Sequence, residues 1–164
     1  MKEIEKKFLV SQLPEHLQNY KKVEIVQGYL NRGSEPVLRI RKYGKDYFLT
    51  YKYATDEEKQ RKINICTEYE LPITSEAFNH LKTKIDGKII SKTRYYVPFC
   101  NQTLEIDIFK DWLEGLVIAE IEFETEDEAR KFNKPSWLGK EVTKDRRYRN
   151  SYMSSGNVDV QELL

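Results

Sequence analysis

Charged residues spaced two apart recur along this 164-residue chain. Side chains alternate between the two faces of a β-strand, so residues i and i+2 share a face. The spacing therefore predicts several strands that each carry one charged face. The charged positions in this pattern are Glu3, Glu5 and Lys7; Arg39 and Arg41; Lys52 singly; Glu68 and Glu70; Lys92 and Arg94; Glu105 and Asp107; and Glu120, Glu122 and Glu124.

The residues between these charges are mostly apolar or aromatic, as with Ile4, Ile40, Ile106 and Ile121. An ordinary half-solvated sheet explains any one of the pairs, because antiparallel sheets commonly have one face in water. It explains the whole set less well, since like charges two apart on one face repel each other. A ligand shared by the strands would compensate this repulsion.

The two signs of charge are segregated strand by strand, which indicates the kind of ligand. Arginine and lysine donate to phosphate oxygens, and carboxylates bind hard divalent cations, often together with the phosphates of a substrate. The pattern therefore favours a polyphosphate with a metal ion. So many charges are too costly for a dry core, so we expect a water-filled interior, with the apolar face turned outward and covered by helices.

The elements that must position these residues are mainly strands. Alternating β-branched and aromatic content predicts strands at about 3–10, 22–31, 36–43, 46–53, 62–71, 87–98, 102–110 and 116–124. Hairpin turns are expected at Arg32-Gly33-Ser34-Glu35 and Tyr43-Gly44-Lys45-Asp46. Helices are predicted at about 13–20, 75–84 with Thr74 or Ser75 as cap, 126–132, and within 146–155. Many antiparallel strands with few helices indicate a sandwich or a barrel of the mainly β (α+β) class.

Composition narrows the class of protein. There are 28 Lys and Arg and 27 Asp and Glu, a net charge of +1, which argues against a nucleic-acid or membrane-surface binder. Without an apolar run suited to a signal peptide or a membrane span, we expect a cytoplasmic protein. Cys66 and Cys100 are isolated and predict neither a disulfide framework nor a zinc site. We expect one domain at 1–156 and a C-terminal tail at 157–164.

The segment Glu3-Ile4-Glu5-Lys6-Lys7 resembles the Glu-x-Glu-x-Lys motif of the CYTH superfamily, the triphosphate tunnel metalloenzymes. The resemblance extends over essentially the whole chain. It includes Gln27-Gly28-Tyr29-Leu30, Leu38-Arg39-Ile40-Arg41, Lys52, Glu68-Tyr69-Glu70, Lys92-Thr93-Arg94-Tyr95, Glu105-Ile106-Asp107, Ala119-Glu120-Ile121-Glu122-Phe123-Glu124 and the segment 141–150. Length and motifs look most like those of the small bacterial inorganic tripolyphosphatases.

This resemblance implies a closed eight-stranded antiparallel β-barrel, the triphosphate tunnel, with helices packed outside. It also implies hydrolysis of a triphosphate with Mg²⁺ or Mn²⁺, at a two-metal site. The implied phosphate-binding residues are Lys7, Arg39, Arg41, Lys52, Lys92 and Arg94. The implied metal ligands are Glu3, Glu5, Glu122, Glu120 and Asp107. The implied catalytic residues are Glu5, Lys52 and Glu122. Tyr29, Asp145 and Arg147 are expected near a tunnel mouth, and Glu68 and Glu70 are expected to orient the basic residues.

The substrate within this family stays open. Inorganic triphosphatase, thiamine triphosphatase and class IV-type adenylate cyclase grip the same triphosphate, and the site residues do not separate them. A non-catalytic module that binds polyphosphate or nucleotides is a further alternative. A small-molecule triphosphate is the expected partner. A homodimer is left open, and it would have to use surfaces other than strand edges, because a closed barrel has none.

Overall fold

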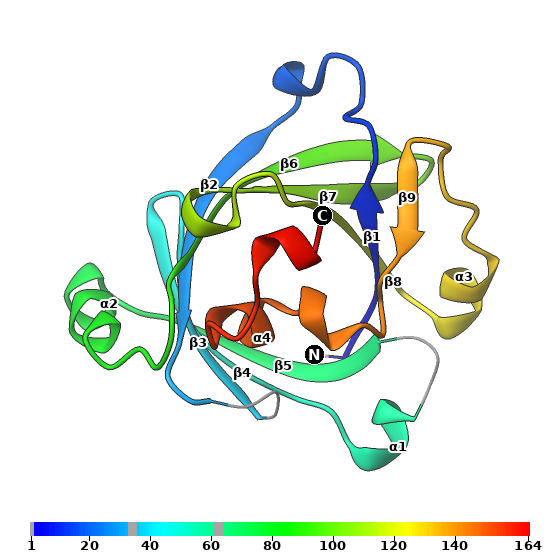
Figure 1. Cartoon of the computed structure of the whole chain (residues 1–164). Helices are drawn as coiled ribbons and strands as arrows, with labels where there is room; N and C mark the ends of the chain where they lie inside the picture. The colour runs from blue at the N-terminus through cyan, green and yellow to red at the C-terminus, as the bar shows by residue number, and fades with distance from the viewer. Residues whose placement is uncertain (1, 33–35, 61–63) are drawn as a thin grey trace.

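A computed structural model describes residues 2–32, 36–60 and 64–164 of the chain (Figure 1). Within these residues it contains nine strands. They are β1 (Lys2–Val10), β2 (Lys22–Tyr29), β3 (Val37–Tyr43), β4 (Asp46–Tyr53), β5 (Asn64–Pro72), β6 (Ile90–Phe99), β7 (Gln102–Phe109), β8 (Val117–Phe123) and β9 (Leu138–Glu141). The first eight match the predicted strands. The turn expected at Arg32-Gly33-Ser34-Glu35 and the first residues of the strand expected at 62–71 lie outside the described residues.

The strands form one antiparallel sheet in the order β5-β4-β3-β2-β6-β7-β8-β1-β9. The sheet closes because β1 also pairs with β5, through Glu3 opposite Cys66 and Ile4 opposite Ile65. Further along β1, the same edge pairs with β9 through Phe8 and Val10. The prediction of a closed eight-stranded barrel is therefore confirmed, and β9 is an additional strand that the sequence pattern did not reveal. Figure 1 looks down the barrel axis.

Short helices lie between the strands and after the last strand, β9. They are α1 (Asp56–Lys59), α2 (Ser75–Lys82), α3 (Glu126–Lys131), α4 (Asn150–Ser154) and 3-10 turns at Leu17–Asn19, Asp111–Leu113, Arg146–Tyr148 and Val160–Glu162. The helix expected at 13–20 is reduced to one 3-10 turn, and α1 was not expected. Thr74 caps α2 by accepting a hydrogen bond from the Ala77 backbone N–H, and Thr125 caps α3 in the same way.

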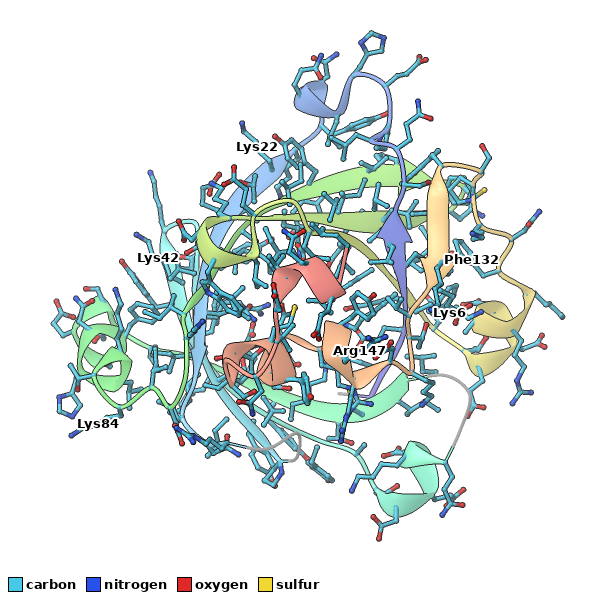
Figure 2. All side chains as sticks on the ribbon, viewed as in Figure 1. Lys6, Lys22, Lys42, Lys84, Phe132 and Arg147 are labelled. Atoms are coloured by element: carbon cyan, nitrogen blue, oxygen red, sulfur yellow. The ribbon has the colours of Figure 1, made fainter. Side chains whose placement is uncertain are left out.

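The outward face of the barrel carries the larger apolar core. Ile4, Phe8, Ile106 and Ile121 are buried there, and α3 covers them in part. Phe132, labelled in Figure 2, follows α3 and packs edge-on against Phe123, with ring centroids 5.4 Å apart. The sequence-based expectation of an apolar face turned outward under helices holds on this side of the barrel.

The outer face of β4 and β5 differs from that expectation. Tyr51, Tyr69 and Leu71 are 39%, 59% and 60% exposed there. Helix α2 packs further along β4, where Phe78 contacts Tyr47 with ring centroids 5.1 Å apart. The helices are too few and too short to cover all of the apolar face.

Residues 142–164, which we call the C-terminal cap, fill one end of the barrel and not its outside (Figure 1). The Val142 backbone N–H donates to the Lys7 carbonyl at 2.8 Å, and the Lys88 N–H donates to the Ser154 carbonyl at 2.6 Å. A second buried cluster joins the cap to the strand ends. Its members are Tyr29, Ile90, Phe109, Leu113, Leu116, Ile118, Val142, Tyr148, Met153 and Leu163. The expected tail is thus part of the core, because Leu163 is buried.

The part of the chain that the structure describes contains no helix long and apolar enough to cross a membrane. Both cysteines are free: Cys66 is buried and Cys100 is exposed in the turn between β6 and β7.

Candidate functional site

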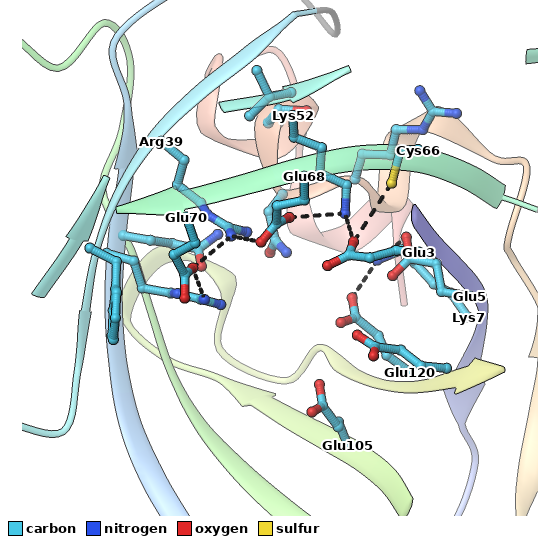
Figure 3. Close-up of a pocket in the computed structure, with 18 of the residues that line it drawn as sticks. Glu3, Glu5, Lys7, Arg39, Lys52, Cys66, Glu68, Glu70, Glu105 and Glu120 are labelled. Carbon is cyan, nitrogen blue, oxygen red and sulfur yellow. Dashed lines mark hydrogen bonds and ion pairs between the residues drawn. The ribbon is translucent and has the colours of Figure 1, made fainter. Parts of the chain in front are cut away.

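The charged strand faces enclose a cavity of about 350 Å³ inside the barrel (Figure 3). It is lined by nearly all of the residues singled out by the spacing of charges. These are Glu3, Glu5, Lys7, Arg39, Arg41, Lys52, Glu68, Glu70, Lys92, Arg94, Glu105, Glu120 and Glu122. Antiparallel pairing brings them together, because each strand turns the same alternate face inward. Glu124 lies beyond the end of β8 and is exposed.

Arginines of β3 face carboxylates of β5 across β4. Arg39 donates to Glu68 at 3.4 Å and to Thr50 at 3.2 Å, and Arg41 pairs with Glu70. The Nε atoms of both arginines are buried without a hydrogen-bond partner in the described residues. A buried donor without a partner is unusual in a native protein, and these two N–H groups can still donate to a ligand.

Lysines on β1 and β4 make the next set of pairs. Lys52 donates to Glu3 at 2.5 Å and lies 3.4 Å from Glu68. Lys7 pairs with Glu120 and lies 3.4 Å from Glu5. Burial alone would lower the pKa of Lys7, but the carboxylates of Glu120 and Glu5 outweigh it and raise that pKa. Burial also opposes the charge of Lys52, but the carboxylates of Glu5 and Glu3 outweigh it and raise the pKa of Lys52, so both lysines stay cationic inside the barrel, as phosphate binding requires.

The most buried charges lie between β6 and β7. Arg94 binds Asp107 with two hydrogen bonds of 2.7 Å, and it also pairs with Glu105 and with Glu120 at 2.9 Å. Lys92 pairs with the same Asp107. Asp107 is fully buried, does not line the cavity, and has its oxygens paired with these two cations. The expected role of Asp107 as a metal ligand does not fit this placement.

Carboxylates predominate at the end of the cavity away from the cap. Glu122 is opposite Glu5 in the pairing of β1 with β8, and no ion pair to Glu122 is found among the described residues. Partial burial and the charges of Glu3 and Glu105 raise the pKa of Glu122 to about 7. Unneutralised negative charge of this kind would be relieved by a bound cation.

The three residues expected near a tunnel mouth belong to the end of the barrel that the C-terminal cap fills. Tyr29 is buried at the closed end, where its hydroxyl accepts a hydrogen bond of 2.9 Å from Gln27. Arg147 binds Asp145 at 2.6 Å on the surface of the cap (Figure 2), and neither residue lines the cavity. At that end Tyr29 lines the cavity, whereas Asp145 and Arg147 do not.

Several residues of the cavity wall were missed by the spacing of charges. The cap contributes Arg149, Asn150 and Ser151, which lie outside any strand and so outside a period-two pattern. Gln27 is uncharged and therefore lies outside the pattern of charges, although it begins the segment Gln27-Gly28-Tyr29-Leu30. Cys66 also faces inward, donating to Glu3 at 3.6 Å, and burial raises the pKa of its thiol to about 12. It remains a protonated thiol at neutral pH, which agrees with a mechanism without a cysteine nucleophile.

The donor chemistry of the carboxylate end suits a divalent metal. Its oxygens are the ligands that Mg²⁺ and Mn²⁺ prefer. Among the described residues, however, no three metal-ligating side chains are already arranged around one point. Glu3 and Glu120 are engaged with lysine and arginine instead. Metal binding would therefore require these ion pairs to rearrange.

Fold and site together define a barrel protein with a cation-lined cavity and a carboxylate cluster. The chain belongs to the CYTH domain family, whose model matches residues 1–155. Membership implies the use of a divalent metal in general. The chain is 36% identical to an inorganic triphosphatase of Nitrosomonas europaea, with 94% of this chain and 97% of the relative covered. It is 39% identical to an inorganic triphosphatase of Acetivibrio thermocellus, covering 92% and 91%. A crystal structure of an inorganic triphosphatase superposes with a TM-score of 0.68 at 36% identity, covering 93% and 94%.

Proposed function

We propose that this protein hydrolyses inorganic tripolyphosphate to pyrophosphate and phosphate. The observation that carries the proposal is the convergence of cations from four strands on one cavity closed at one end. These cations are Lys7, Arg39, Arg41, Lys52, Lys92 and Arg94. The similarity to two inorganic triphosphatases over more than nine-tenths of the chain supports the same activity.

Binding of a triphosphate would be an exchange of partners. Each of these cations is paired with a carboxylate, as Arg41 is with Glu70 and Lys7 is with Glu120. Phosphoryl oxygens would replace some of those carboxylates, and arginine can grip two oxygens of one phosphoryl group at once. The displaced carboxylates then become available to a metal ion. Substrate and metal would thus assist each other's binding.

We assign metal binding to Glu3, Glu5 and Glu122, with Glu120 as a further ligand, and we expect Mg²⁺ or Mn²⁺. When bound, such ions neutralise phosphate charge and activate water. Asp107 is left out because it is buried under Lys92 and Arg94. A site with two ions is the arrangement that we expect for this set.

The protein's own residues supply position and charge. In phosphoryl transfer, water forms a bond to the terminal phosphorus while the bond to the bridging oxygen breaks, and negative charge spreads over the phosphoryl oxygens. Lys52 and Arg39 lie where they could neutralise that charge, held in place by Glu68. Preorganised cations of this kind commonly account for a large part of the rate enhancement. Glu5 and Glu122 are proposed to act through the metal and the attacking water.

A product assay tests this function. Purified protein with Mg²⁺ or Mn²⁺ is given tripolyphosphate, pyrophosphate, ATP or thiamine triphosphate in separate reactions, and phosphate, pyrophosphate and cyclic AMP are measured. We expect phosphate and pyrophosphate from tripolyphosphate at the highest rate. Cyclic AMP with pyrophosphate from ATP would instead indicate a cyclase, faster release of phosphate from thiamine triphosphate would indicate that substrate, and tight binding without turnover would indicate a binding module.

Two variants connect the assay to the residues. Glu5→Gln should abolish metal-dependent turnover, because the amide loses the charge that holds a cation. Arg41→Ala should chiefly weaken the binding of tripolyphosphate. Unchanged rates in both variants would refute the assignment of the site.

We also propose a cytoplasmic location, which the two free cysteines support, since thiols stay reduced there.

A further inference from the structure

Arg149, in the C-terminal cap, differs from the other cations that line the cavity. Each lysine and arginine contributed by the barrel strands has a carboxylate partner. Within the described residues, Arg149 makes no ion pair and no side-chain hydrogen bond, and its Nε atom is buried without a partner. It is a cation at the cavity wall without a carboxylate partner in the part of the chain that the structure describes.

The neighbouring residue Asn150 also has a buried side-chain atom without a hydrogen-bond partner among the described residues. The side-chain Oδ1 of Asn150 is buried without a hydrogen-bond partner in the described residues, and Ser151 also lines the cavity. Burying a polar group without a partner is unfavourable, and most buried polar groups in native proteins have one. The unpartnered Nε of Arg149 is a donor on the wall of the cavity and points to an anionic ligand, whereas the unpartnered Oδ1 of Asn150 is an acceptor that an anion does not satisfy.

The topology places Arg149 at the opposite end of the cavity from the carboxylate cluster. Along β8, the inward-facing residues run from Glu122 through Glu120 to Ile118. Ile118 is packed in the same buried cluster as Met153 of the cap. Glu122 and Ile118 are four residues apart, or about 13 Å along an extended strand. A ligand held at both ends must therefore be elongated.

We propose that Arg149 binds the phosphoryl group that lies deepest in the cavity, at the closed end of the triphosphate. A guanidinium offers two parallel donors to one phosphoryl group, and an asparagine amide beside it can present its N–H donors. The inference rests on the proposed function and extends it to a residue of the cap. Arg149 then selects for the longer polyphosphate chain, because a diphosphate held at the carboxylate end does not reach it.

Binding measurements with matched variants test this inference. Calorimetric titration of tripolyphosphate and of pyrophosphate in EDTA gives both affinities without turnover. Steady-state kinetics with Mg²⁺ then separates KM from kcat. The variants are Arg149→Gln, Arg149→Lys, which keeps the charge but loses the planar fork, and Arg146→Gln. Arg146 is an exposed arginine of the same segment that lies against Tyr152, outside the cavity.

Arg149→Gln should weaken tripolyphosphate binding about 10- to 100-fold, the usual effect of losing a charge-assisted hydrogen bond. Pyrophosphate affinity should change much less, Arg149→Lys should fall between, and Arg146→Gln should match the wild type. Equal losses for both phosphates, or an equal loss in Arg146→Gln, would overturn the inference. So would unchanged tripolyphosphate affinity in Arg149→Gln. If Arg149→Gln kept its tripolyphosphate affinity and still hydrolysed it, only the role of Arg149 would be refuted and the proposed function would stand. A wild-type protein that neither binds nor hydrolyses tripolyphosphate would refute the role of Arg149 and the proposed function together.

Discussion

Replacement of Asp107 by asparagine should destabilise the fold without removing a metal ligand. Asp107 is fully buried, accepts two hydrogen bonds of 2.7 Å from Arg94 and pairs with Lys92. Asparagine keeps the shape but not the charge, so Lys92 is left buried without its only ion-pair partner among the described residues. Breaking a buried ion pair in this way costs about 3–5 kcal/mol. For a chain of this size that corresponds to a fall in Tm of about 6–20 °C.

The measurement is thermal unfolding of Asp107→Asn in metal-free buffer, together with a titration of Mn²⁺. Glu105→Gln is the matched control, because Glu105 pairs with the same Arg94 but its side chain is 23% exposed. A partly solvated pair contributes about 0–1 kcal/mol, so the control should shift Tm by only a few degrees. Mn²⁺ affinity should be unchanged in Asp107→Asn. A lost Mn²⁺ affinity with an unchanged Tm would refute the reasoning and make Asp107 a ligand.

Three further predictions concern the carboxylate end and the arginines. Chelation of divalent metal with EDTA should abolish hydrolysis, and added Mn²⁺ or Mg²⁺ should restore it; hydrolysis that persists in EDTA would contradict the assigned role of Glu3 and Glu5. Because the folded protein raises the pKa of Glu122, the wild type loses stability as pH rises from about 4.5 towards 7 and Glu122 ionises. In metal-free buffer Glu122→Gln should therefore have a higher Tm than the wild type at pH 8 but not at pH 4. A difference in Tm that is independent of pH would count against this. Glu70→Gln should lower Tm by at most a few degrees, because Glu70 is partly exposed and its partner Arg41 lies at the cavity wall, and unfolding curves check it.

The barrel could be predicted from the sequence because its strands obey one simple rule. Glu3, Glu5 and Lys7 lie two apart on the first strand, and charged pairs at the same spacing recur on five of the later strands, as with Arg39 and Arg41. Strand β9 has no such signal: it is four residues long and its pairing partner is remote in sequence. Helix α1 did have a local signal, since Thr55 and Glu58 form a capping box that the sequence displays as Thr-x-x-Glu.

The site was less predictable than the barrel, and the reason is packing. The period-two pattern shows that Asp107 faces inward, but it cannot show that Lys92 and Arg94 occupy its oxygens. The same pattern is silent on Arg149, because the cap is helical and irregular. Tyr29 faces the interior as expected, yet the cap buries it. Tertiary contacts of the last residues decide which end of the barrel is open.

The ion pairs inside the cavity allow the barrel to hold many charged side chains and still bind a polyanion. Like cations close together would repel each other in an empty barrel, and Glu68 and Glu70 on β5 prevent this by holding Arg39 and Arg41 apart in a fixed geometry. Those carboxylates make a bound phosphate less favourable, since it must compete with them. Among the described residues Arg149 makes no ion pair, so under the proposal above a triphosphate would bind it without displacing a carboxylate.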